Sequence, residues 1–192
     1  MSAVAHPTGW ISPEEYLEGE RLSEVRHEYI NGYVYAMAGA SDDHNRIAGN
    51  IFGEWRERLR GKTWEAFGPD MKLKLPSALG GVFYYPDVTV ACDPKDNAKY
   101  HRERPALIFE VMSPDTERID RGEKARAYHE ITTLKAYILV EQDRAGITVL
   151  HRIDNDWRQE MFEGPDAVLK LPGLGIEIPF NRIYERTRLL TP

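Results

Sequence analysis

The chain has 192 residues, of which 42% are apolar, 29% charged and 10% aromatic. A chain of this length and ordinary composition is expected to fold as a single domain, residues 1–192, that buries roughly 70% of the surface exposed by its unfolded form. The formal net charge of −6 argues against a protein that coats nucleic acid through its overall charge, although it leaves room for a local basic site.

Other classes of protein are disfavoured by what the sequence lacks. No stretch approaches the ~18 consecutive apolar residues of a membrane span, and the first ten residues contain neither a basic region nor a long apolar one. We therefore expect a cytoplasmic protein with no membrane partner. Cys92 is the single cysteine, so an internal disulfide is impossible and a zinc site is not indicated.

The first third of the chain predicts a helix, a hairpin and a second helix. A capping box at Ser12 and Glu15 predicts a short helix over residues 12–17. The Asn-Gly pair within residues 27–37 predicts a β-hairpin, because this dipeptide is the strongest short-range hairpin signal. Large apolar side chains at four-residue steps predict an amphipathic helix over residues 41–60.

The middle of the chain predicts three strands. Residues 63–75 and 81–92 are rich in β-forming residues and are separated by a turn-rich segment at residues 76–81. A third strand is predicted within "RPALIFEVMSPDT", residues 104–116.

The last third predicts one more helix and a run of strands. Asp120 and Glu123 form an acidic capping box that predicts the start of a helix over residues 120–131. Strands are then predicted over residues 134–142, 145–153 and 156–162, and an irregular segment with a short helix over residues 171–185. This order of elements predicts an α/β (α+β) fold with a central mixed sheet flanked by helices.

Glu110 lies inside the apolar run Ala106–Met112, where an unpartnered carboxylate costs several kcal/mol or becomes neutral. Asp87 has a similar place in the preceding strand, and pairing of the two strands would set the two carboxylates side by side. A divalent cation between them, Mg²⁺ or Mn²⁺, would remove their repulsion. The alternative is that Glu110 pairs with an Arg or Lys, or lies at a strand end open to water.

The helix over residues 120–131 places Arg121, Lys124 and Tyr128 on one face by their spacing. A lysine on the inner side of this helix would reach the strand ends, where hydrolysis of a phosphodiester requires a cation. The alternative is a lysine that extends along apolar surface to water. Basic residues around this helix, among them Arg118, Arg121 and Arg126, predict contacts to phosphate, unless they are only solvated.

The ordered segments "YPDVTVACD", "PALIFEVMSPDT", "DRGEKARAYHEI" and "LKAYILVEQ" resemble the PD-(D/E)XK nuclease superfamily, and more closely its Uma-type branch of bacterial proteins. The resemblance extends from about Ser12 to Ile153. It implies a restriction-endonuclease-like core preceded by an N-terminal helix and hairpin. It also implies a DNA substrate and Mg²⁺-dependent hydrolysis of phosphodiester bonds.

The resemblance implies that Asp87 and Glu110 are metal ligands, with the backbone carbonyl of Val111 as a third. The motif lysine should stand two residues after the glutamate, where this chain has Met112. Several superfamily members carry the lysine on the following helix, so the resemblance implies Lys124 in that role, with Tyr128 supporting it.

Two more residues match the N-terminal signature of the branch. Glu28 would help to bind a second metal, and His44 would approach phosphate or water, unless it is a surface histidine on the first helical turn. A competing prediction is a binding or assembly module that keeps the fold without turnover, favoured by the missing motif lysine and the acidic net charge. A homodimer is also expected, because cutting both strands of a duplex takes two sites and residues 176–190 carry exposed-looking apolar side chains.

Overall fold

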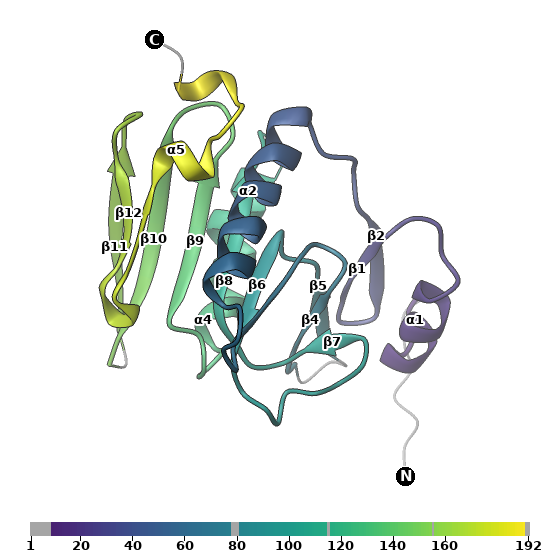
Figure 1. Cartoon of the computed structure of the whole chain (residues 1–192). Coiled ribbons are helices and arrows are strands. Elements are labelled where there is room, and N and C mark those ends of the chain that lie inside the picture. Colours follow the sequence, from purple (N-terminus) through teal and green to yellow (C-terminus); the bar gives the residue numbers. More distant parts are fainter. Residues whose placement is uncertain (1–8, 78–80, 115, 155, 191–192) are drawn as a thin grey trace.

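The computed structural model describes residues 9–77, 81–114, 116–154 and 156–190 of the chain (Figure 1). The helices are α1 (Pro13–Glu20), α2 (Asp42–Arg58), α3 (Glu117–Ile119), a π-helical turn η1 (Asp120–Lys124), α4 (Ala125–His129), α5 (Phe180–Ile183) and two 3₁₀ turns, η2 (Pro172–Leu174) and η3 (Arg188–Leu190). The strands are β1 (His27–Ile30), β2 (Tyr33–Ala36), β3 (Glu65–Phe67), β4 (Lys72–Leu75), β5 (Val82–Tyr84), β6 (Val88–Ala91), β7 (His101–Arg102), β8 (Pro105–Met112), β9 (Ala136–Glu141), β10 (Gly146–Ile153), β11 (Asp156–Glu163), β12 (Val168–Leu171) and β13 (Ile176–Pro179).

The strands form three sheets. A six-stranded sheet has the order β11-β10-β9-β8-β6-β3, and a five-stranded sheet has the order β2-β1-β5-β4-β7. Strands β12 and β13 form a separate antiparallel pair. In the six-stranded sheet only β8 and β9 run parallel, so the predicted mixed sheet is confirmed.

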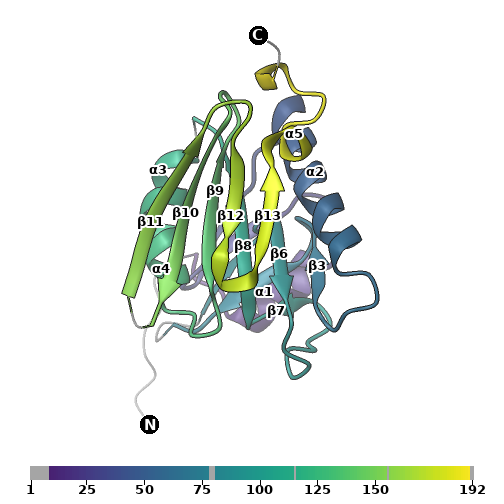
Figure 2. The ribbon, with the colours of Figure 1, turned by 60° about the vertical axis from the view of Figure 1, so that its left-hand side comes forward.

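Alternation along β8 divides the core into two layers. Leu107, Phe109 and Val111 pack in a cluster with residues of α2, β12, β13 and α5. Ile108 and Met112 pack on the opposite face, in a cluster with α4 and with strands of the five-stranded sheet. Figure 2 shows α4 on one side of the six-stranded sheet and α5 on the other. Glu110 has the same parity as Ile108 and Met112, so its side chain enters the layer between the two sheets.

The local signals in the first third of the chain are confirmed. Ser12 and Glu15 form both hydrogen bonds of a capping box at the start of α1. Asn31 and Gly32 have φ values of 52° and 102° and close the β1–β2 hairpin, as a two-residue hairpin turn requires. The amphipathic helix is α2, which Ser41 caps through the His44 N–H.

Two predicted strands were wrong, because each is a pair of short strands. Residues 63–75 form β3 and β4, which the Gly68–Pro69 turn separates, and these strands belong to different sheets. Residues 81–92 form β5 and β6, also in different sheets, and Pro86 lies in the break because it has no N–H to donate to a ladder. Residues 78–80 of the predicted turn lie outside the described residues.

The helix after β8 begins three residues earlier than predicted, at Glu117. The turn before it is stabilised by Ser113, whose carbonyl accepts hydrogen bonds from the N–H groups of Thr116 and Glu117. Asp120 therefore lies within the helix and is buried, so its predicted role as a capping residue is wrong.

The C-terminal segment is more regular than predicted and less exposed. It contains the β12–β13 pair as well as the predicted helix, α5. Ile178, Phe180 and Ile183 are buried in the α2 layer of the core, so these apolar side chains are not available to pair two copies of the chain. Among the described residues, no helix is long and apolar enough to cross a membrane.

Candidate active site

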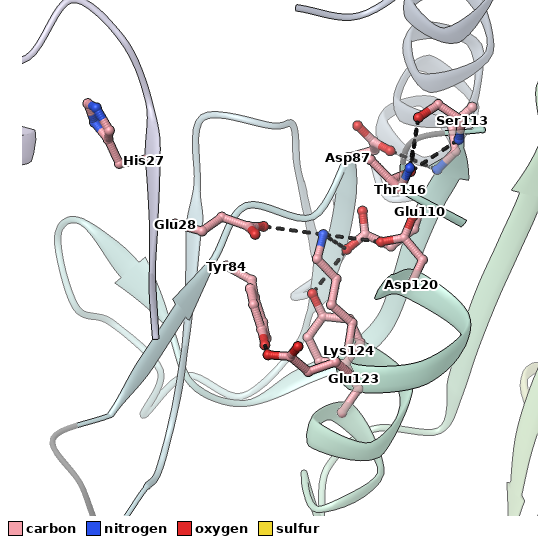
Figure 3. A network of polar contacts seen from close by, with 12 residues as sticks. His27, Glu28, Tyr84, Asp87, Glu110, Ser113, Thr116, Asp120, Glu123 and Lys124 are labelled. Carbon is pink, nitrogen blue, oxygen red and sulfur yellow. Dashed lines mark hydrogen bonds and ion pairs between the residues drawn. The ribbon is translucent and has the colours of Figure 1, made fainter. Parts of the chain in front are cut away.

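The Lys124 ammonium lies at the centre of a buried cluster of carboxylates. Its Nζ is 3.2 Å from Glu28 Oε1, 3.2 Å from Glu110 Oε1 and 3.3 Å from Asp120 Oδ1. Figure 3 shows the lysine side chain between Glu28 on one side and Glu110 and Asp120 on the other. These groups come from β1, β8 and η1, so the site forms only when the five-stranded sheet, the six-stranded sheet and the helix pack together.

Glu110 has two partners in this cluster. Besides its contact with Lys124, its Oε1 accepts a hydrogen bond of 3.0 Å from the Tyr128 hydroxyl. Burial raises the pKa of the Glu110 carboxyl well above its usual range, Lys124 opposes that rise, and the charges of Asp120, Asp87 and Glu28 add to it. Glu110 is therefore paired with a lysine, which was one of the alternatives to a metal ion considered from the sequence.

Lys124 remains a cation in this position. Burial alone would lower the pKa of its ammonium, but Glu110, Glu28 and Asp120 outweigh burial and raise it well above its usual range. The Nζ also lies 5.4 Å from the centre of the Tyr84 ring, a favourable site for a cation. Lys124 thus acts as a donor of hydrogen bonds and positive charge.

Asp87 is held at the start of β6 by two contacts. Its Oδ2 accepts a hydrogen bond of 2.7 Å from the Val111 N–H, and its Oδ1 lies 2.9 Å from His44 Nε2. The last pair of the β6–β8 ladder is Val88 with Phe109, so Asp87 and Glu110 are the next residues beyond it on the two chain segments. The bond to the Val111 N–H places the Asp87 carboxylate near Glu110, whose pKa its negative charge helps to raise.

Several predicted residues have contacts other than those expected. His44 contacts Asp87, so it is not a free surface histidine. Tyr128 contacts Glu110 rather than Lys124. Arg121 does not join Lys124 and instead forms ion pairs of 2.9 Å with Glu117 and 2.8 Å with Glu141. The π-helical turn explains why Arg121 and Lys124 point in different directions. A π-helix has a wider turn than an α-helix, so residues three apart no longer share one face of the helix.

The sequence prediction missed Asp120. Asp120 is 2% exposed, and its carboxylate contacts Lys124, four residues later in the chain. The available signal was the Asp-Lys spacing of i,i+4, which pairs opposite charges on a helix. This pairing was overlooked because Asp120 and Glu123 also match the pattern of a helix capping box.

The donor set is suited to a hard divalent cation. Glu28, Asp87, Glu110 and Asp120 supply only oxygen atoms, which Mg²⁺ prefers, and these carboxylates outnumber the ammonium of Lys124. In the part of the chain that the structure describes, no three His, Cys, Asp or Glu side chains are already grouped as a complete metal site. Met112, at the motif lysine position, is buried in the apolar cluster on the same side of β8.

The sequence of this chain matches a known protein family. The family model Uma2, "Putative restriction endonuclease", matches residues 13–181. Two proteins of Synechocystis sp. (strain ATCC 27184 / PCC 6803 / Kazusa) are similar along most of their length. "Uncharacterized protein slr1290" is 34% identical over 187 residues, covering 94% of this chain and 97% of that protein. "Uncharacterized protein sll1609" is 32% identical over 171 residues, covering 87% and 96%.

A solved structure shares the fold. It is described as "a putative nuclease belonging to DUF820" from Anabaena variabilis ATCC 29413 and matches with a TM-score of 0.72 at 17% identity, covering 91% of this chain and 97% of that chain. The fold is therefore restriction-endonuclease-like, and the family supports a nuclease-like function. With a family model that spans most of the sequence and relatives above 30% identity, this chain belongs to the Uma2 family.

Proposed function

We propose that this protein is a metal-dependent endonuclease that hydrolyses phosphodiester bonds in DNA. The observation that carries the proposal is the convergence of Glu28, Glu110 and Asp120 on the Lys124 ammonium, with Asp87 bonded to the N–H of Val111, the residue after Glu110. Hydrolysis of a phosphodiester needs oxygen ligands for a cation and a fixed donor for the charge that develops on phosphate. This cluster offers both.

Asp87 and Glu110, with the backbone of Val111, would hold Mg²⁺ or Mn²⁺, which would supply positive charge at the scissile phosphate. In hydrolysis a water oxygen bonds to phosphorus, the bridging P–O bond breaks and the leaving oxygen gains a proton. Lys124 would orient that water or stabilise the developing charge, since it can donate but is surrounded by acceptors.

Other side chains hold these groups in place. The Tyr128 hydroxyl fixes Glu110, and the His44 imidazole fixes Asp87. Glu28 and Asp120 hold Lys124 from two different elements, β1 and η1. Such supporting contacts keep reacting groups within the narrow geometry that catalysis requires.

The test is cleavage of DNA by the purified protein with Mg²⁺, with Mn²⁺ and with a chelator. We expect cleavage only with a metal, and a loss of about 10²–10³-fold or more in Asp87→Asn, Glu110→Gln and Lys124→Met. Glu54→Gln is the matched control, because Glu54 is also buried and ion-paired, with Arg58 and Arg182, on the later turns of α2. Cleavage that persists in the chelator, or in Glu110→Gln, would contradict the proposal.

One observation favours a second candidate, a DNA-binding or assembly module without turnover. Met112 replaces the motif lysine, and Lys124 is already engaged by three carboxylates. That candidate predicts DNA binding with no cleavage in either metal, whereas the nuclease predicts binding followed by cleavage.

A further inference from the structure

The β1–β2 hairpin extends the candidate active site toward the edge of the five-stranded sheet. The register places Glu28 opposite Tyr35 and Ile30 opposite Tyr33. Directly opposed residues in an antiparallel pair share one face, with Cβ atoms ~4.5–5.5 Å apart. Ile30 packs against the apolar cluster that contains Tyr128. Tyr33 and Tyr35 therefore lie on the same face as Glu28, the face that turns toward Lys124.

Both tyrosines are uncovered. Tyr33 is 40% exposed and Tyr35 is 52% exposed, and their strand β2 is the outer strand of its sheet. Across the described ranges of the chain, neither ring stacks on another ring and neither hydroxyl forms a hydrogen bond. Two unpartnered aromatic rings beside a buried charged site are available to a ligand.

We propose that Tyr33 and Tyr35 form a stacking platform for unpaired bases, so that the site acts on single-stranded or locally unpaired DNA in preference to a continuous duplex. The inference rests on the proposed nuclease function and names its substrate class. Aromatic side chains bind successive bases of any sequence because every base has a π face, and those faces are available only where the strands are unpaired.

Charge favours the same substrate. With a net charge of −6, the chain gains little from attraction to phosphate, so contacts to bases have to supply much of the affinity. The platform strand, Tyr33-Val34-Tyr35-Ala36, carries no acidic side chain that would repel a nucleic acid strand. Its face is continuous with Glu28, which contacts Lys124, so a base stacked there would lie next to the cluster.

The experiment measures binding in a chelator, so that no cleavage occurs, by fluorescence anisotropy of labelled oligodeoxynucleotides. The probes are a single strand, its duplex, and a single strand in which abasic sites replace the bases. We expect the wild type to prefer the natural single strand to both other probes. Tyr33→Ala and Tyr35→Ala should each weaken that binding about tenfold or more, whereas the two Phe variants keep it. Val34→Ala is the matched control, since Val34 is 41% exposed on the opposite face of the same strand.

Other outcomes would overturn the platform. Equal affinity for the single strand and the abasic strand, or unchanged affinity in both Ala variants, would show that no base stacks there. A wild type that is dimeric in light scattering and becomes monomeric in the Ala variants would assign this face to a second copy of the chain. If the base-dependent binding is present but no metal supports cleavage, the nuclease proposal fails while the platform stands.

Discussion

Lys124 is the residue on which the charge balance of the site depends. It is 7% exposed and is the cation shared by Glu28, Glu110 and Asp120. Removing one of three carboxylates leaves the lysine with two partners, whereas removing the lysine leaves the buried Glu110 and Asp120 and the partly buried Glu28 without their cation. Breaking a buried ion pair is costly mainly through the charge left unpaired.

This asymmetry predicts opposite effects on stability. Lys124→Met should lower the free energy of unfolding by about 3–5 kcal/mol without added metal, the usual cost of an uncompensated buried charge. Glu110→Gln should be as stable as the wild type or more stable, because burial already disfavours its charge and an amide oxygen can still accept from Tyr128. Urea denaturation of both variants measures the difference.

Addition of Mg²⁺ should also distinguish the wild type from Glu110→Gln. A ligand that binds only the folded state raises the melting temperature, so Mg²⁺ should stabilise the wild type and have less effect on Glu110→Gln. Glu110→Gln that loses as much stability as Lys124→Met would make the pair with Lys124 a purely structural contact.

At the scale of elements, the β1–β2 hairpin is positioned by its turn. Gly32 has φ +102°, and a Cβ at this residue would lie 1.8 Å from Trp10 Cδ1. The Ile11 N–H also donates to the Gly32 carbonyl, so the segment before α1 lies directly against the turn. The same hairpin carries Glu28 to Lys124, which links the packing at the turn to the geometry of the site.

Gly32→Ala should therefore impair both folding and activity. We expect a loss of stability greater than the roughly 1–2 kcal/mol cost of a left-handed backbone alone, because the indole of Trp10 must also move. Gly61→Ala separates the two effects, since Gly61 has φ +75° but no neighbouring atom within 4 Å of the added Cβ. Thermal melts and cleavage rates of both variants are the measurements. Equal losses in the two variants would mean that the Trp10 contact does not position the hairpin.

Elements that are defined by interactions between residues close in sequence were predicted correctly, whereas elements defined by distant partners were not. The capping box at Ser12 and the hairpin turn at Asn31 are local, and both were predicted correctly. The division of residues 81–92 between two sheets is set by partners far along the chain, so strand propensity alone did not find it. Asp120 was misplaced because a π-helical turn has no simple sequence signal and the burial of Asp120 depends on tertiary packing.

At the scale of the whole molecule, the negative net charge means that contact with DNA must be local. Arg118 and Arg126 are exposed on the helix that follows β8, and across the described ranges of the chain neither forms an ion pair. Arg121 lies between them but is paired with Glu117 and Glu141. The three arginines, predicted together to contact phosphate, therefore differ in their availability.

We expect the exposed Arg118 and Arg126 to bind DNA and the paired Arg121 to stabilise the fold. A paired arginine supports the fold, whereas an exposed one is available to bind phosphate and release counterions. Replacing Arg118 and Arg126 by Ala should weaken DNA binding at low salt and reduce the slope of log K against log salt by about 0.7–0.9 for each lost contact, with the melting temperature unchanged. Arg121→Ala should instead lower the melting temperature and leave the salt slope intact, because it strands Glu141 beside Arg144 alone. Binding titrations at several salt concentrations, with melts of each variant, measure both quantities. A salt slope that falls only in Arg121→Ala would reverse the assignment, and a slope unchanged in every variant would place the DNA on another face of the molecule.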